Sequence, residues 1–70
     1  MNIKRYYLLK CHNNSNMVIA EEECVTITGA ISSFKGTFPN LKLDKYGYYK
    51  IGDVTYCVVY RLCDRLELLI

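Results

Sequence analysis

Residues 46–62 read YGYYKIGDVTYCVVYRL and carry the clearest structural signal in the chain. Two runs rich in β-branched and aromatic residues, 46–51 and 54–62, flank the pair Gly52-Asp53, and runs of this composition favour strands. Glycine at the first central position of a two-residue loop is typical of a type II′ turn, which joins antiparallel strands. The stretch therefore predicts a β-hairpin that turns at Gly52 and Asp53.

Side chains along the second arm of this hairpin alternate between two faces, because successive residues of a strand point in opposite directions. One face is mostly apolar and the other is mixed: Val54, Tyr56, Val58, Tyr60 and Leu62 share the first, and Thr55, Cys57, Val59 and Arg61 share the second. Cys57 and Val59 also suit partial burial. The pattern indicates a central strand that is covered on both faces.

The N-terminal part of the chain predicts a second antiparallel hairpin. Residues 3–11 centre on Tyr-Tyr-Leu-Leu, a composition that favours a strand although it does not alternate cleanly. Residues 12–16, HNNSN, predict a turn, since Asn tolerates a positive φ and both Asn and Ser close local backbone hydrogen bonds. Residues 17–20 then predict a short returning strand.

Residues 21–36 are open to two interpretations. Apolar side chains at spacings of 3, 4 and 3 predict one face of a helix: Cys24, Ile27, Ile31 and Phe34. In this interpretation Glu21, Glu22 and Glu23 lie near the helix N-terminus, where the helix dipole favours carboxylates. Gly36 is then the left-handed C-cap.

The β-branched run 25–28 and Gly29 weaken the helical interpretation, because these residue types are poor helix formers. The alternative extends a strand through Thr28, which then caps a shorter helix. Both interpretations contain a helix over residues 29–35, so we expect at least that much of the segment to be helical.

The rest of the chain adds a loop and two short elements. Residues 37–40 contain the only proline and predict a loop, residues 41–43 a short strand, and residues 64–70 a last strand or a short helix. Together these elements predict a single α+β domain over residues 1–70. It consists of a small antiparallel sheet of four to six strands with one short helix packed on one face.

Length and composition limit the classes of protein to consider. Seventy residues allow one domain with a small core, and 51% apolar against 23% charged residues is the composition of a folding chain. The net charge of +2 is too mild to indicate a nucleic-acid partner by itself. The sequence shows neither a signal peptide nor about 20 continuous apolar residues, so we expect a cytoplasmic protein without a membrane segment.

The cysteines and the single histidine form no pattern typical of a catalytic or metal site. Cys11, Cys24, Cys57 and Cys63 lack the close ligand pairs of zinc sites, and without a secretory signal we expect reduced thiols that behave as core residues. His12 lies in the Asn-rich turn, and the four glycines are too scattered for a phosphate loop. We therefore expect neither an enzyme nor a cofactor or metal.

Residues 42–50, KLDKYGYYK, are the most distinctive candidate surface. The residues expected to contact a partner are Lys45, Tyr46, Tyr48, Tyr49 and Lys50. Tyrosine is enriched in the hot spots of protein interfaces, and aromatic residues among basic ones also stack bases in single-strand binders. The simpler explanation is that tyrosine suits strands and lysine protects exposed sheet edges.

The acidic triplet Glu21, Glu22 and Glu23 is a second candidate for partner binding. It is the only sharp negative cluster in the chain and would suit a basic groove on a partner. Such runs are more often solvated loops or helix starts.

These features predict a non-enzymatic protein-binding module that inhibits or regulates a larger host enzyme or complex. The general composition, short and rich in Asn, Lys and Tyr, resembles that of orphan proteins from compact genomes such as bacteriophages, and the resemblance implies a host–virus interaction in the host cytoplasm. The alternative is a small nucleic-acid-binding protein that uses the same lysines and tyrosines. An apolar C-terminus and short sheet edges are compatible with a homodimer.

Overall fold

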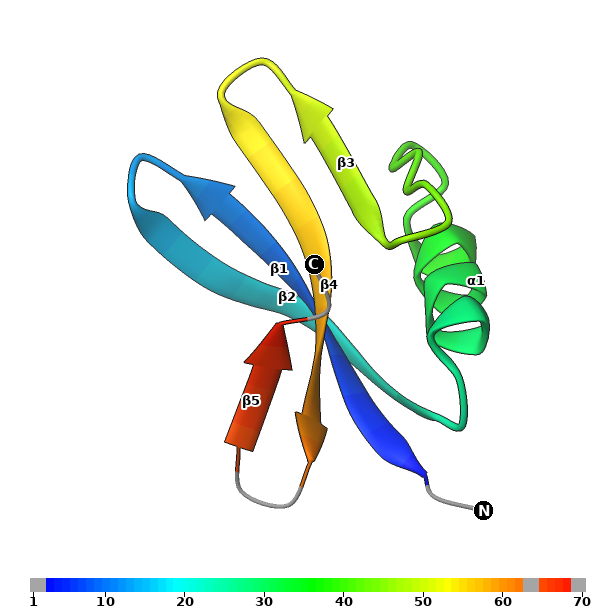
Figure 1. The fold of residues 1–70 in the computed structure, drawn as a ribbon. Helices are drawn as coiled ribbons and strands as arrows, with labels where there is room; N and C mark the ends of the chain where they lie inside the picture. The colour runs from blue at the N-terminus through cyan, green and yellow to red at the C-terminus, as the bar shows by residue number, and fades with distance from the viewer. Residues whose placement is uncertain (1–2, 63–64, 69–70) are drawn as a thin grey trace.

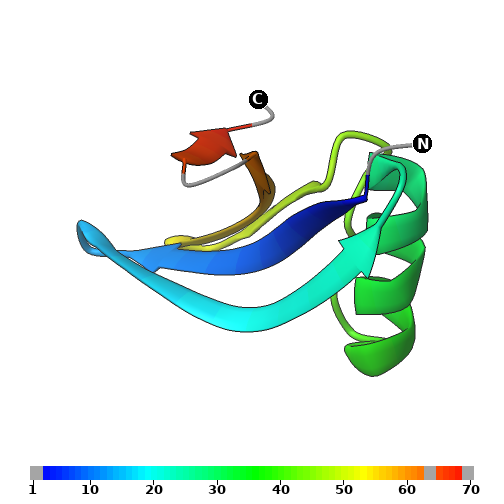
Figure 2. The same cartoon turned by 90° about the horizontal axis from the view of Figure 1, so that it is seen from below.

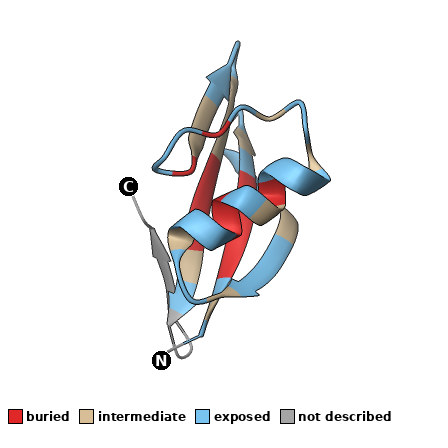
Figure 3. Ribbon diagram, turned by 90° about the vertical axis from the view of Figure 1, so that its right-hand side faces the viewer, coloured by how far each residue is buried: buried red, intermediate tan, exposed pale blue. Residues whose placement is uncertain are grey.

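The computed structural model describes residues 3–62 and 65–68, which form an antiparallel sheet and one helix (Figure 1). In chain order the elements are β1 (Lys4–His12), β2 (Ser15–Cys24), α1 (Ile27–Thr37), β3 (Tyr48–Ile51), β4 (Val54–Leu62) and β5 (Arg65–Leu68). The sheet has five strands, and the short helix packs on one of its faces (Figure 3). The predicted α+β class is therefore confirmed.

β1 and β4 are the central strands of the sheet, whose order is β2-β1-β4-β3. β1 pairs with β4 along residues 55–61 and so occupies one edge of β4 over most of its length. β3 and β5 share the opposite edge, where β3 pairs with residues 54–57 and β5 with residues 59–62. The last predicted element is thus a strand over residues 65–68, and the rest of the range 64–70 lies outside the described residues.

Both predicted hairpins form, and each turns on two residues. Gly52 has a φ of 60° while the φ of Asp53 is not positive, which fits the predicted type II′ turn. Asn13 and Asn14 have φ values of 50° and 65°, the pattern of a type I′ turn. The first turn is therefore narrower than the predicted range 12–16, and β2 is longer than predicted.

β2 contains a β-bulge opposite the junction of Leu8 and Leu9. Leu8 pairs with Ala20 and Leu9 with Val18, so Ile19 is the extra residue. Ile19 and Ala20 both pack against the apolar cluster beneath α1, although they are neighbours in one strand. The bulge therefore adds an apolar side chain to the face that the helix covers, and it interrupts the regular ladder of this outer strand.

Thr26, rather than Thr28, caps the N-terminus of α1. The backbone of Thr26 is extended, and its Oγ1 accepts a hydrogen bond from the N–H of Gly29 at 3.1 Å. The helix consequently begins at Ile27, and the prediction that Thr28 ends a strand and caps the helix is wrong. The acidic triplet lies in β2 instead of at the helix N-terminus, because β2 continues to Cys24.

The C-terminus of α1 also lies further along the chain than predicted. The helix continues through Thr37, and the N–H of Phe38 donates to the carbonyl of Phe34 at 2.8 Å. Gly36 does not have a positive φ and lies inside the last turn. The prediction of a left-handed C-cap at Gly36 is therefore wrong.

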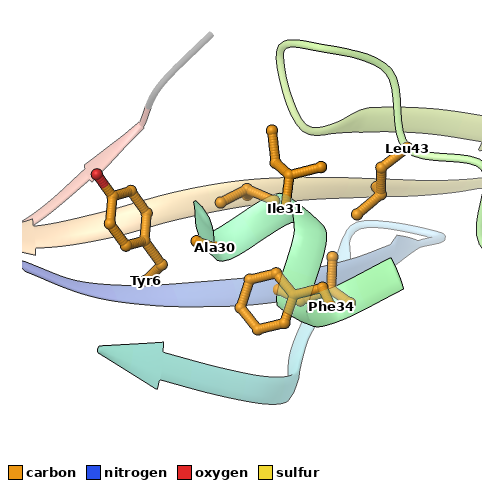
Figure 4. Close-up of a cluster of buried hydrophobic side chains, with 7 residues drawn as sticks. Tyr6, Ala30, Ile31, Phe34 and Leu43 are labelled. Atoms are coloured by element: carbon orange, nitrogen blue, oxygen red, sulfur yellow. The ribbon is translucent and has the colours of Figure 1, made fainter. Parts of the chain in front are cut away.

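Apolar clusters lie on both faces of the sheet. The main core, between α1 and the sheet, consists of Tyr6, Leu8, Ala30, Ile31, Phe34, Leu43 and Val58 (Figure 4). The cluster on the opposite face consists of Tyr7, Leu9, Cys57 and Val59. The predicted burial of β4 on both faces is confirmed. Figure 2 shows that α1 packs across one end of the twisted sheet, so the tips of both hairpins extend beyond it.

Residues 41–43, predicted as a short strand, do not join the sheet. The N–H of Leu41 donates to the carbonyl of Phe38 at 3.0 Å. Leu41 and Leu43 both pack against the core beneath α1. The strand prediction is wrong because the apolar side chains of this segment close one side of the core instead of extending the sheet.

Gly47 lies directly against β4. Its φ is 78°, and a Cβ atom on it would lie 2.8 Å from both Cβ and Cγ2 of Val58. The close approach lets the Gly47 carbonyl accept a hydrogen bond from the N–H of Val58 at 2.9 Å. The left-handed φ and the contact with Val58 both require glycine here.

We expect Gly47→Ala to lower the free energy of unfolding by about 2–4 kcal/mol, because the added methyl group must displace Val58 and a left-handed φ is unfavourable for alanine. Urea denaturation followed by circular dichroism measures the change. Gly36→Ala is the matched control, because nothing lies within 4 Å of its Cβ position. That variant gains up to about 1 kcal/mol from helix propensity. Equal free energies of unfolding for the two variants would contradict the packing at Val58.

Candidate partner-binding surface

Residues 44–48 form a tight turn, named the Asp44 turn below, that leads into β3. Oδ1 of Asp44 accepts hydrogen bonds from the N–H of Tyr46 at 2.9 Å and from the N–H of Tyr48 at 3.0 Å. The N–H of Gly47 donates to the Asp44 carbonyl at 2.9 Å. A short polar side chain that bonds the backbone two residues on is the usual device for holding such a turn. The turn therefore fixes its two tip residues, Lys45 and Tyr46, at the surface.

Tyr46 is the most exposed of the tyrosines whose side chains the structure describes. It is 61% exposed, and Nζ of Lys45 lies 5.2 Å from the centroid of its ring. A cation near an aromatic face is an attractive arrangement even when both groups are in contact with water. The tip of the Asp44 turn thus presents one aromatic ring and one positive charge together.

The other two tyrosines of the predicted surface lie on opposite faces of the sheet. Tyr48 packs against the cluster that contains Cys57, on the face opposite α1. Tyr49 packs on the helix face, and its ring stacks on that of Tyr56 with centroids 6.2 Å apart. Successive residues of a strand diverge in this way. Of the five predicted residues, only Lys45 and Tyr46 share the tip of the turn, and Lys50 is exposed further along β3.

A groove of about 380 Å³ separates α1 from the Asp44 turn. It is lined by Thr28, Ile31, Ser32, Lys35, Leu43, Asp44 and Lys45. Ile31 and Leu43, which lie near one another in Figure 4, belong to the buried core and so form an apolar floor. Two hydroxyl groups, two ammonium groups and the Asp44 carboxylate line the rest, and the predicted site residue Lys45 lies on one wall.

Positive charge dominates the segment around this groove. Residues 35–50 contain four lysines and one aspartate, a formal net charge of +3. The ion pairs found among the described residues all involve Arg5, so neither Lys35 nor Lys45 has a carboxylate within 4.0 Å in that part of the chain. The carboxylate of Asp44 already accepts two backbone hydrogen bonds. Among the described residues, neither lysine of the groove forms an ion pair.

Thr28, Ser32 and Lys35 line the groove and are not among the residues that the sequence pattern indicated. Their spacing of four and three residues places all three on one face of α1. That spacing is a signal present in the sequence. Its significance depends on the position of the Asp44 turn beside this face, which is a tertiary contact.

The acidic triplet is divided between the two faces of β2. Nη1 of Arg5 lies 3.0 Å from Oε1 of Glu21, and Nη2 lies 2.8 Å from Oε2 of Glu23. The hydrogen bond and charge of Glu23, followed by the charge of Glu21, raise the pKa of Arg5 above its usual value. Glu22 pairs with Tyr6 in the ladder and therefore points to the opposite face. Two of the three carboxylates are thus engaged within the protein.

The outer edge of β2 is the longest sheet edge among the described strands, at ten residues. The bulge at Ile19 interrupts it, and Glu21, Glu22 and Glu23 place charge along its second half. Both features are common devices against the addition of another strand. The bulge and the charges make the β2 edge a less suitable contact surface than the Asp44 turn. The predicted homodimer stays a prediction.

A second groove, of about 470 Å³, lies on the helix face near the C-terminus of α1. Its lining is mostly apolar and includes Ile19, Phe38, Leu41 and Tyr56, with Lys10 as the one cation. This lining has one lysine where the groove beside the Asp44 turn has two, and its aromatic rings, Phe38 and Tyr56, are half-buried.

Cys57 is a buried thiol on the face opposite α1. The register pairs Leu9 with Cys57, so Cys11 is a diagonal neighbour on the same face. Burial, together with the adjacent Cys11 thiol, raises the pKa of Cys57 to about 11. A thiol with a raised pKa is a poor nucleophile at neutral pH. Cys57 therefore acts in packing, while Cys63 lies outside the described residues.

We expect the free energy of unfolding to fall as the pH rises from about 9 to about 11. In this range the Cys57 thiol of the unfolded chain loses its proton, whereas the buried thiol of the folded protein keeps its proton up to about pH 11. The loss amounts to at most about 3 kcal/mol. Urea denaturation at a series of pH values measures it. Cys57→Ala has a lower stability at neutral pH and a flatter profile above pH 9. Parallel profiles for the two proteins would refute the assignment to Cys57.

Comparisons with protein-family models, curated proteins and solved structures found no match. Within the described part of the chain, α1 does not have the length and apolar character that crossing a membrane requires. No three His, Cys, Asp or Glu side chains of the described residues come together as metal ligands.

Proposed function

We propose that this protein is a non-enzymatic protein-binding module that inhibits or regulates a larger protein, with Tyr46 and Lys45 at the centre of the contact. The observation that carries the proposal is the 61% exposed ring of Tyr46 at the tip of a hydrogen-bonded turn. Tyrosine is among the residues most enriched in interface hot spots. In a host cell infected by a phage, the partner would be a host enzyme or complex.

The tyrosines of the chain differ in how far they are exposed. Tyr46 is exposed, whereas the other six are buried or half-buried in the packing of the sheet: Tyr6, Tyr7, Tyr48, Tyr49, Tyr56 and Tyr60. The stability of the sheet accounts for those six rings. It does not account for Tyr46, because the Asp44 turn is held by hydrogen bonds to the carboxylate and the carbonyl of Asp44 and by the conformation of Gly47.

The Asp44 turn is suited to binding because it is already ordered in the free protein. Two hydrogen bonds to the Asp44 carboxylate and the contact of Gly47 with Val58 fix its backbone. A partner therefore does not have to order a flexible loop, which is one of the main costs of association. A rigid aromatic side chain with few rotatable bonds adds to this advantage.

The protein exposes enough surface in total for a specific interface. The accessible surface is 4975 Å², and a standard interface buries roughly 800 Å² on each partner, about a sixth of this area. The surface around the Asp44 turn and the exposed side of α1 can supply it. A chain of this size could then block a larger enzyme without a catalytic site of its own.

We expect Tyr46→Ala to weaken binding of the partner about 30-fold, the effect of losing a hot-spot side chain. The measurement is capture from a lysate of the native host with tagged wild type and variant, followed by titration of the recovered protein. Met17→Ala is the matched control, since Met17 is 62% exposed on the other hairpin. Recovery of the same partner at equal strength by wild type and Tyr46→Ala would refute this contact surface.

Tyr48 and Tyr49 are unsuited to the same test. Each packs against one of the two apolar clusters, so their replacement by alanine destabilises the fold as well as any interface. The variants Lys45→Ala and Tyr46→Ala change exposed side chains and leave both clusters intact.

A further inference from the structure

We infer that the groove between α1 and the Asp44 turn receives an acidic segment of the partner protein, with carboxylates against Lys35 and Lys45 and an apolar side chain on the floor formed by Ile31 and Leu43. The inference rests on the proposed function, because it names the class of partner for the same surface. It is drawn from the shape of the groove, its charge and the distribution of acidic residues elsewhere in the molecule.

The shape of the groove suits a peptide segment. Its volume of about 380 Å³ is at the small end of ligand sites, which span roughly 300–1,000 Å³. A groove of this size holds a few side chains of a partner. Ile31 and Leu43 are 7% and 4% exposed, so their accessible atoms form a narrow apolar strip at the bottom.

The polar lining of the groove favours a carboxylate. Lys35 on α1 and Lys45 on the Asp44 turn supply positive charge from opposite walls. Thr28 and Ser32 add hydroxyl donors on the helix wall, one turn apart. Asp44, the single acidic residue in the lining, directs its carboxylate to the N–H groups of its own turn.

The acidic residues outside the groove leave it free for a negatively charged partner. Glu21 and Glu23 are bound to Arg5 at the β1–β2 pair. Asp53 lies at the tip of the β3–β4 hairpin, beyond the end of the sheet that α1 covers (Figure 1). Of the described carboxylates, only that of Asp44 belongs to the lining of the groove, although Glu22 lies on the same face of the sheet as α1. The two lysines of the lining outnumber this carboxylate, and the resulting positive charge attracts an acidic partner.

A protein segment fits these features better than a nucleic acid. Binding of a nucleic-acid strand uses a row of cations along the backbone and several aromatic platforms for bases. Two lysines line this groove, and Tyr46 is the one strongly exposed ring beside it. The apolar floor can contact a leucine or phenylalanine side chain of a peptide, whereas it offers no favourable contact to a phosphate group.

The test is an NMR titration of ¹⁵N-labelled protein with three probes. The first is a twelve-residue peptide in which Glu and Asp alternate with Leu and Phe. The second is its counterpart with Lys in place of each acidic residue, and the third is a twelve-nucleotide oligothymidylate. We expect the acidic peptide alone to give saturable shifts at the amides of Thr28, Ser32, Lys35 and Lys45. These shifts should weaken as salt rises.

Charge-reversal variants test the named lysines. We expect the double variant Lys35→Glu, Lys45→Glu to bind the acidic peptide at least tenfold more weakly. The matched pair Lys4→Glu, Lys10→Glu changes two lysines of β1 that do not line the groove, and we expect it to bind the peptide nearly as well as wild type. The dispersion of the amide spectrum confirms that each variant is folded. Equal loss in both pairs would mean a non-specific charge effect and would overturn the inference.

Other outcomes separate this inference from the proposed function. If the acidic peptide shifts none of these amides while Tyr46→Ala still weakens capture of the host protein, the groove assignment is overturned and the binding module stands. If oligothymidylate shifts the same amides and the acidic peptide does not, the partner is a nucleic acid and both are overturned. Equal shifts from the acidic and basic peptides would also overturn the assignment.

Discussion

The close contact between Gly47 and Val58 connects the candidate surface to the core. Val58 is fully buried in the central strand, and its N–H donates to the Gly47 carbonyl. Leu43, before the turn, packs beneath α1, and β3 begins one residue after Gly47. The base of the Asp44 turn is thus part of the core, while its tip projects into solvent. The geometry at Val58 consequently sets the orientation in which Tyr46 is presented.

The protein has two small apolar clusters, one on each face of the sheet, instead of one larger core. Tyr6 and Tyr7 are consecutive and are buried on opposite faces of β1, and Cys57 and Val58 do the same in β4. A chain of this length has few residues with which to bury surface, so the use of both faces of the central strands increases the buried fraction. The aromatic content of the sequence reflects this requirement, and Tyr46 is the exception to it.

Local patterns predict the elements whose geometry is set within a few residues, such as the turn between β3 and β4 and the alternation of β4. They misplace the start of α1, because Thr26 and Thr28 are equivalent caps by type and the choice depends on where β2 ends. They predict the candidate surface in part. Lys45 and Tyr46 are neighbours in sequence, whereas the groove requires α1 to lie beside the Asp44 turn, and no local signal specifies that contact.

The pairing of β1 with β4 joins two strands that are far apart in the chain. Leu8 pairs with Val58, although β2, α1 and β3 all lie between them in the chain. Each hairpin can close locally, whereas this central pairing must close a long loop, which makes folding slow for its size. Until β4 pairs with β1, the edge of β1 that faces β4 has no partner strand, so the β1–β2 hairpin exposes an unpaired edge during folding.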